Sequence, residues 1–366
     1  MKQRPSTMKF FHHPANIANF VIFASSMVSM ATSLSNPATA AATTKLNPYG
    51  TAEINYSAAN EYLDEQYEQK IPNPYFPNTK TKEPVYNGRD GVYDDDTKEF
   101  REPSLETCGF ALRPLPAPDV DDWTNKRQLR DNYLPELRAY FENLYGKDKI
   151  RHLLFYNPMS RGEELNAERR DLAGHELPTS PTQTMAHMDN DWIASNVDRV
   201  VGLVEKQTLD YFDDPNAFPR QALMEDIQRG YRYMVVNCWR NAGDTPIQRA
   251  PLGVHATKYR HDTSKVFPEV QPDFSRSRWY VFPEMTKDEC LLFKQYDRDD
   301  RYISDVWHCA LHSLSHNKNK ATPRKSFDVR AFIILEQQVP KPHDRYGEDR
   351  LEPKFKTAEE HQANTN

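Results

Sequence analysis

Residues 186–190 contain a histidine, His187, and an aspartate, Asp189, separated by one residue. In an extended chain, residues i and i+2 point to the same side, so this imidazole and this carboxylate would meet at one point. Such a pair supplies two of the three protein ligands of a mononuclear iron(II) centre. The pattern is short and also fits a hydrogen-bonded surface turn. A third candidate ligand elsewhere in the chain is needed to favour the metal centre over the turn.

The candidate third ligand is His308, which lies far along the chain from the His-x-Asp pair. Two imidazoles and one carboxylate on one face of an octahedron leave three exchangeable positions, which suits iron(II) that must bind an oxo-acid and oxygen. A fold that uses all three ligands has to bring distant segments together. The facing strands of a jelly roll do this at the mouth of the sandwich.

The composition and the order of the predicted elements favour the same fold. Proline is abundant at 27 residues and glycine sparse at 12, with 19 tyrosines and 18 phenylalanines, which suits strands joined by rigid turns. We therefore expect a mainly β protein with helices, a distorted double-stranded β-helix (jelly roll) backed by helices, and not a parallel doubly wound sheet. Strands are expected over 109–115, 150–157, 233–239, 279–282, 289–296 and 329–335, and helices over 122–146, 192–212 and 218–230.

The first predicted helix has the clearest periodicity. Gly146 ends it, and its apolar positions recur at helical spacing as core residues. These positions are Leu129, Tyr133, Leu137, Phe141 and Leu144.

The chain divides into four regions by composition. Residues 1–43 contain no Asp or Glu and pair a basic start with an apolar run, so we expect a targeting segment (a signal or transit peptide) or a disordered extension. Without targeting, the compartment would be cytoplasmic. Residues 44–107 are expected to form an extended N-terminal arm with at most one short strand or helix, residues 108–338 the jelly-roll oxygenase-like domain, and residues 339–366 a disordered charged tail.

Charge and cysteine content exclude several classes of protein. The net charge of −6 gives no basic field for nucleic acid, and the apolar run near the N-terminus is broken by serines, so we expect no nucleic-acid partner and no stable membrane span. The four cysteines are scattered without a Cys-x-x-Cys pair, which predicts reduced core residues. The oligomeric state stays open.

A candidate anion site follows His308 in the sequence. Arg324 and Ser326 would share one face of a strand, where a guanidinium can grip a carboxylate through two parallel hydrogen bonds and a hydroxyl can add a third. This suits the distal carboxylate of 2-oxoglutarate. Arg330 lies on the same face and is the alternative anchor, while a surface ion pair is the alternative interpretation of Arg324.

Several segments resemble one known family when they are taken together. They are Asn237-Cys-Trp-Arg240, Pro251-Leu252, the stretch 279–297, His308-Cys-Ala and Pro323-Arg-Lys-Ser-Phe-Asp-Val-Arg330. In order and spacing they resemble the fungal hydroxylase/desaturase family of CmcJ-like proteins, which includes AsaB-like proteins and the gibberellin desaturase. The resemblance implies an oxygenase dependent on Fe(II) and 2-oxoglutarate that hydroxylates or desaturates a small-molecule substrate, often of secondary metabolism.

The resemblance also implies residue roles. The metal ligands fall on His187, Asp189 and His308, and the co-substrate residues on Arg324 and Ser326. Arg161, expected on a loop after a strand, and Arg240, at the end of another strand, become candidate substrate contacts.

Two other functions remain open from the sequence. The first is a non-catalytic jelly-roll binding protein. The second is a zinc hydrolase, because His308, His312 and His316 recur every four residues and would share one face of a helix. No Glu lies nearby to act as the general base, which disfavours this second function.

Overall fold

The computed structural model describes most of the chain between residues 46 and 339. The described ranges are 46–56, 61–64, 69–72, 80–117, 119–162, 177, 179–189, 197–256, 259–262, 269–272, 277–299, 301–304, 306–317 and 322–339. The targeting segment expected over 1–43 and nearly all of the charged tail expected over 339–366 lie outside these ranges, so both stay predictions.

Strands outnumber helices in the described structure, and the α-helices lie between β7 and β10 in the chain. The strands are β1 (Gly50–Asn55), β2 (Glu61–Asp64), β3 (Gln69–Pro72), β4 (Lys80–Asn87), β5 (Val92–Asp94), β6 (Glu99–Arg101), β7 (Phe110–Pro114), β8 (Ile150–Gly162), β9 (Thr179–Pro181), β10 (Tyr231–Asn241), β11 (Leu252–Ala256), β12 (Tyr259–Asp262), β13 (Glu269–Pro272), β14 (Arg278–Val281), β15 (Glu289–Asp297), β16 (His308–Ala310) and β17 (Lys325–Gln338). The α-helices are α1 (Lys126–Gln128), α2 (Leu134–Tyr145), α3 (Val197–Gln207) and α4 (Arg220–Gln228).

Two sheets organise these strands. One has six strands in the order β7-β15-β10-β17-β8-β9, and the other has five in the order β1-β4-β14-β11-β16. The chain passes repeatedly between them in its second half: β10, β15 and β17 belong to the first sheet, while β11, β14 and β16 belong to the second. This alternation is the winding of a double-stranded β-helix, and it confirms the expected fold class, a jelly roll backed by helices.

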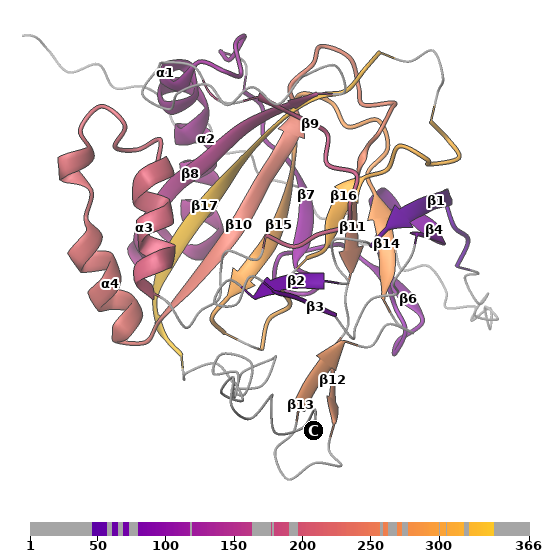
Figure 1. Ribbon diagram of the computed structural model, residues 1–366, viewed down its shortest axis with the longest axis horizontal. Helices are drawn as coiled ribbons and strands as arrows, with labels where there is room; N and C mark the ends of the chain where they lie inside the picture. Colours follow the sequence, from indigo (N-terminus) through magenta and orange to yellow (C-terminus); the bar gives the residue numbers. More distant parts are fainter. Residues whose placement is uncertain are drawn as a thin grey trace, which may run out of the picture. The chain divides into compact units, whose positions relative to one another are not determined.

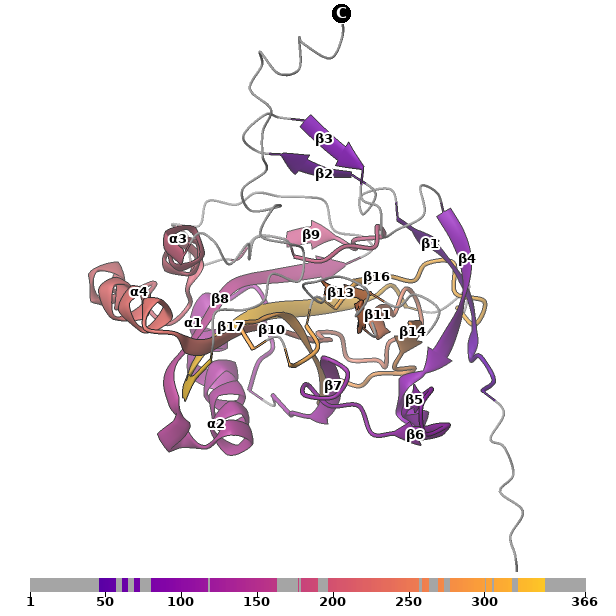
Figure 2. The ribbon, with the colours of Figure 1, turned by 90° about the horizontal axis from the view of Figure 1, so that it is seen from below.

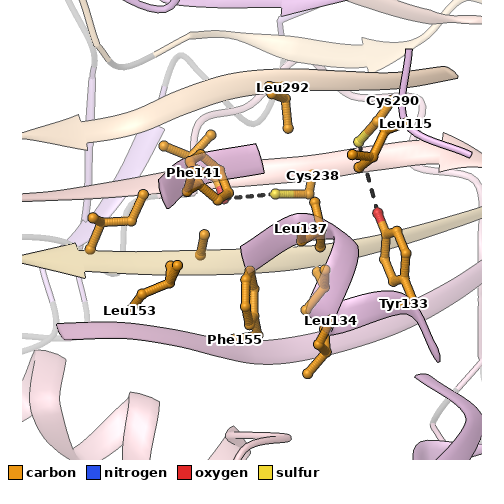
Figure 3. Close-up of a cluster of buried hydrophobic side chains, with 14 of the residues drawn as sticks. Leu115, Tyr133, Leu134, Leu137, Phe141, Leu153, Phe155, Cys238, Cys290 and Leu292 are labelled. Carbon is orange, nitrogen blue, oxygen red and sulfur yellow. Dashed lines mark hydrogen bonds between the residues drawn. The ribbon is translucent and has the colours of Figure 1, made fainter. Parts of the chain in front are cut away.

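The six-stranded sheet is covered on both faces. Because side chains alternate along a strand, Phe155 and Cys238 point to one face, where they pack against Leu137 and Phe141 of α2 (Figure 3). The opposite face is covered over part of its length by α3 and α4 (Figures 1 and 2). The rest of that second face carries the polar side chains described below.

The first helical region differs in detail from its prediction. It begins at α1, continues through a π-helical turn over Leu129–Tyr133, and ends where Gly146 adopts a φ of 89° that favours glycine. Four of its five expected core positions are buried, but the side chain of Leu144 is 44% exposed. The last position of the apolar stripe therefore lies outside the core.

The segment expected as an N-terminal arm contributes more structure than one short element. β1 and β4 pair with each other, and β4 also runs parallel to β14, so this segment supplies two strands of the five-stranded sheet. The segment is rich in Tyr, Asn and Pro, so its sequence does not indicate the alternation of buried and exposed residues that β1 shows.

Two expectations about the rest of the chain can be compared with the structure. All four cysteines are buried and free of disulfide bonds, as predicted. Within the described residues, no helix is both long enough and apolar enough to cross a membrane.

The packing of α2 on the sheet predicts a large difference between two neighbouring positions. Phe141→Ala removes a fully buried ring and should lower the free energy of unfolding by about 3 to 5 kcal/mol, because a cavity is left in the core. Leu144→Ala, one turn away on the exposed side, should change it by no more than about 0.5 kcal/mol. Urea denaturation measures both values, and equal losses would contradict the described orientation of α2.

Candidate metal centre

His187 and His308 are brought together by backbone pairing. The His187 N–H donates to the carbonyl oxygen of His308 at 3.2 Å, and the His308 N–H donates back to the carbonyl oxygen of His187 at 3.0 Å. Directly opposed residues in an antiparallel pair project to the same side, and the two ring centroids here lie 4.2 Å apart. The segment around His187 thus extends the edge of the five-stranded sheet beside β16.

Asp189 completes a group of three ligands. One candidate ligand atom from each of His187, Asp189 and His308 lies within 4.8 Å of the others. Among the described residues, these three form the one group of at least three His, Cys, Asp or Glu side chains placed closely enough to hold a metal ion. The structure therefore brings together all three residues that the sequence proposed as ligands.

The two imidazoles are oriented by backbone carbonyls in the same way. Nδ1 of His187 lies 2.8 Å from the carbonyl oxygen of Met185, and Nδ1 of His308 lies 3.2 Å from that of Val306. A carbonyl oxygen only accepts, so Nδ1 carries the proton and Nε2 keeps a lone pair for a metal. Burial lowers the pKa of His308 to about 3, so this ring is neutral at pH 7.

The carboxylate of Asp189 reaches across to the six-stranded sheet. Oδ1 accepts from Nη2 of Arg330 at 2.7 Å, and Oδ2 accepts from Nδ2 of Asn237 at 2.8 Å. Burial alone would raise the pKa of this carboxyl. The positive charge of Arg330, the two histidines and the hydrogen bond from Asn237 together outweigh burial, so the pKa of Asp189 lies well below its usual value. Asp189 is therefore ionised near neutral pH.

Gln295 of β15 hydrogen bonds with both chain segments that carry the candidate ligands. Its Oε1 accepts from the backbone N–H of Asp189 at 2.7 Å, and its Nε2 donates to the carbonyl oxygen of Val306 at 3.1 Å. That same carbonyl oxygen faces Nδ1 of His308. One buried amide thus fixes the position of Asp189 and of the strand that carries His308.

The three ligands line one part of a narrow cleft. Its cavity volume is about 30 Å³, room for little more than a water molecule. A larger ligand requires the side chains around the cleft to move. The lining residues are mostly polar: Arg161, Gln183, His187, Asp189, Asn237, Trp239, Leu252, Phe293, His308, Arg324, Asp328 and Arg330.

Arg324 lies in this cleft just before β17 begins. It is 3% exposed, it donates to the carbonyl oxygen of Ala250, and its guanidinium lies 5.3 Å from the ring centroid of Trp239. Ser326 is buried on the same strand, and its hydroxyl donates to the carbonyl oxygen of Arg161 at 3.4 Å. Arg324 and Arg330 are thus lining residues, whereas Ser326 lies next to the cleft without being one.

Arg161 reaches the cleft from a strand, and not from the expected loop. It lies in β8 opposite Ser326 of β17. Its Nε donates to Oδ2 of Asp328 at 2.9 Å, and Nη1 donates to the hydroxyl of Ser180 at 3.3 Å. β8 extends past residue 157 because a bulge there lets the strand continue beside β17.

The structure does not place Arg240 in the cleft. Its neighbour Trp239 lines the cleft, so Arg240 points to the opposite face of β10. There its guanidinium lies 4.7 Å from the ring centroid of Trp123 and 4.9 Å from that of Tyr133, and it donates to the carbonyl oxygen of Lys287. The expected role as a substrate contact does not fit this position, and we assign Arg240 to the core.

The three-histidine zinc alternative is also wrong, because these residues do not form a helix. His308 is in β16, and the chain after it forms turns. Nε2 of His312 hydrogen bonds with the Thr182 hydroxyl at 2.8 Å, while His316 stacks on Tyr49 with ring centroids 4.5 Å apart. The three rings thus have separate environments.

Comparison with protein families agrees with this architecture. Residues 54–334 match a family described as YDMC, the oxidoreductase/YMDC permease-like domain. The chain belongs to this family. The matched range contains every candidate site residue named above. A search among curated proteins found no match.

Solved structures that match this YDMC-family protein share little sequence with it. One is the iron and alpha-ketoglutarate-dependent endoperoxidase NvfI, with 18% identity over 78% of this chain and 97% of that chain and a TM-score of 0.49. Another is EvdO2 from Micromonospora carbonacea var. aurantiaca, with 10% identity over 65% and 91% of the two chains and a TM-score of 0.21. The fold assignment rests on the strand order described above.

Sequence reasoning missed three polar residues of this YDMC-family site: Asn237, Gln295 and Asp328. Each lies on a strand whose other residues are mostly apolar, and each is buried. A polar side chain within a buried strand needs a partner, and that requirement was the available signal.

The separation of the histidines predicts different effects of two alanine substitutions. His187→Ala removes a ligand and should weaken binding of Co(II) by at least about tenfold, because one of three protein ligands is lost. His312→Ala removes a histidine outside the group and should leave the affinity unchanged. Anaerobic titration with Co(II) followed by absorbance measures both. Weaker binding in the His312 variant would restore the alternative site.

Proposed function

We propose that the protein is an iron(II)- and 2-oxoglutarate-dependent oxygenase that hydroxylates or desaturates a small-molecule substrate of secondary-metabolite type. One observation carries the proposal: two imidazoles and a carboxylate converge within 4.8 Å in a cleft that also holds the buried guanidinium of Arg324. The oxidoreductase description of its family is consistent with this chemistry. Membership of the narrower CmcJ-like hydroxylase/desaturase family is part of the proposal.

The ligand group fits iron(II). Two neutral nitrogen donors and one carboxylate, with open positions for exchangeable ligands, are the donor set of non-haem iron(II) oxygenases. His308 and His187 present Nε2 because carbonyl oxygens hold Nδ1, and Asp189 is ionised because Arg330 and Asn237 stabilise its charge. His308 is neutral and Asp189 is ionised near neutral pH, so neither has to lose a proton before a metal binds.

Arg324 fits the distal carboxylate of 2-oxoglutarate. A planar guanidinium forms two parallel hydrogen bonds with a carboxylate, and the Ala250 carbonyl and the Trp239 ring hold the Arg324 group in place. The Ser326 hydroxyl is the candidate third donor after rotation away from the Arg161 carbonyl. Arg330, the alternative anchor, already serves the metal ligand Asp189, so we favour Arg324.

Iron(II) and 2-oxoglutarate, when bound, supply the oxidation of a substrate C–H bond by molecular oxygen, with succinate and carbon dioxide as co-products. The chain positions and shields this chemistry. Trp239, Leu252 and Phe293 give the cleft an apolar side that excludes water. Arg161 and Asp328 form an ion pair within the same lining, and we assign to Arg161 the recognition of a polar group of the substrate.

Substitution of Arg324 tests the proposed co-substrate site. Wild-type protein titrated anaerobically with iron(II) and then 2-oxoglutarate should develop the visible charge-transfer band of the chelate. Arg324→Ala should require about 10- to 100-fold more 2-oxoglutarate, because a charge-assisted pair of hydrogen bonds is lost. Lys325→Ala, which removes an exposed cation at the next position, should behave as wild type.

The result can contradict the proposal at two levels. If folded wild-type protein gives no band, the oxygenase function fails. If a band forms but Arg324→Ala leaves the 2-oxoglutarate affinity unchanged, the function stands and the anchor moves to Arg330.

A further inference from the structure

Arg330 is in direct contact with a proposed metal ligand. Its side chain is 9% exposed, and its Nη2 lies 2.7 Å from Oδ1 of Asp189. A buried guanidinium is costly unless it is paired, so Asp189 and Arg330 stabilise each other. Yet Asp189 is also the residue that a divalent cation would need. A metal and Arg330 are therefore two positive charges that share one carboxylate.

Arg330 has a second partner in Asn157. The orientation of the Asn157 amide that satisfies both groups places its carbonyl oxygen 3.0 Å from Nη1 and 3.3 Å from Nη2 of Arg330. Asn157 has a φ of 50° at the point where the pairing of β8 with β17 shifts register. Asn tolerates this left-handed conformation, and the bulge directs its side chain toward the cleft. The guanidinium thus has a support that does not depend on Asp189.

Asp189 likewise has supports that do not depend on Arg330. Asn237 donates to its Oδ2, and Gln295 accepts from its backbone N–H. If Arg330 were replaced by a neutral residue, Asp189 would keep two of its three contacts, the one between its carboxylate and Asn237 and the one between its backbone N–H and Gln295. The orientation of Asp189 would then change little, and the main consequence would be the loss of the positive charge beside it.

We propose that Arg330 is a positioning residue that provides the counter-charge of Asp189 while no metal is bound, and that it leaves this positive charge available to a dianionic co-substrate once a metal neutralises Asp189. The inference rests on the proposed function, because it needs a divalent cation at His187, Asp189 and His308. It assigns to Arg330 a role separate from the anchoring role of Arg324.

The proposal predicts that Arg330 has opposite effects on two binding steps, the binding of the metal and the binding of 2-oxoglutarate. Like charges repel strongly in a buried site, so Arg330 weakens binding of the metal alone. A dianion bound at the metal is attracted by the same charge, so Arg330 strengthens binding of 2-oxoglutarate to the metal-loaded protein. A substitution that only damaged the fold would weaken both steps, so the opposite signs separate the two explanations.

The experiment measures both steps in Arg330→Gln. Titration with Mn(II) alone, followed by electron paramagnetic resonance of the free ion, should show metal binding about tenfold tighter than in wild type, because a nearby positive charge is removed. Anaerobic titration of the iron(II)-loaded variant with 2-oxoglutarate, followed by its visible band, should show binding about tenfold weaker. Lys325→Gln, which removes an exposed cation of the same strand, should change neither constant.

Asn157→Asp is the second variant, in case Arg330→Gln does not fold. Asp has the shape of Asn, tolerates the same φ and can accept the same hydrogen bonds from Arg330, while its charge neutralises the guanidinium. It should shift both constants in the same directions as Arg330→Gln. Weaker or unchanged Mn(II) binding in the folded variants would overturn the role of Arg330. Absence of Mn(II) binding in wild type would instead overturn the proposed function itself.

Discussion

The candidate site depends on one antiparallel backbone pair, between His187 and His308. The two hydrogen bonds of this pair hold segments that are far apart in sequence in register. Register matters because a slip of one residue would turn an imidazole to the opposite side of the sheet. The same pairing places Asp189 beyond the sheet edge, where it contacts Asn237, Gln295 and Arg330 of the other sheet. The centre is thus built where the two sheets of the jelly roll meet.

The fold class and the shared direction of His187 and Asp189 could be predicted from local patterns, whereas His308 was assigned as the third ligand through the family resemblance. Runs of β-branched and aromatic residues located β10, β14, β15 and β17, four of the eight strands from β10 onward. A His-x-Asp pair in extended chain must present both side chains on one side. β1 and β4 were harder to see, because their segment lacks a clear apolar alternation and their place in the sheet depends on pairing with β14. Long-range pairing partners are not encoded in a local pattern.

The functions assigned to individual arginines show a second limit of sequence reasoning. Arg240 follows Trp239 directly, and alternation alone shows that only one of them can face the cleft. Which one does so depends on the side of β10 that α2 covers, and this is a property of the packed structure. Arg161 was assigned to a loop because the predicted strand ended at residue 157, whereas the bulge at Asn157 lets β8 continue.

The cleft is narrow because its charged groups are paired with one another. Arg161 pairs with Asp328, Arg330 pairs with Asp189, and Arg324 donates to a backbone carbonyl. These contacts offset the cost of burying three cations, and they also occupy the donors that a dianionic ligand would use. Under the proposed function, binding is an exchange of partners, in which a metal replaces Arg330 at Asp189 and a carboxylate competes for the guanidinium groups.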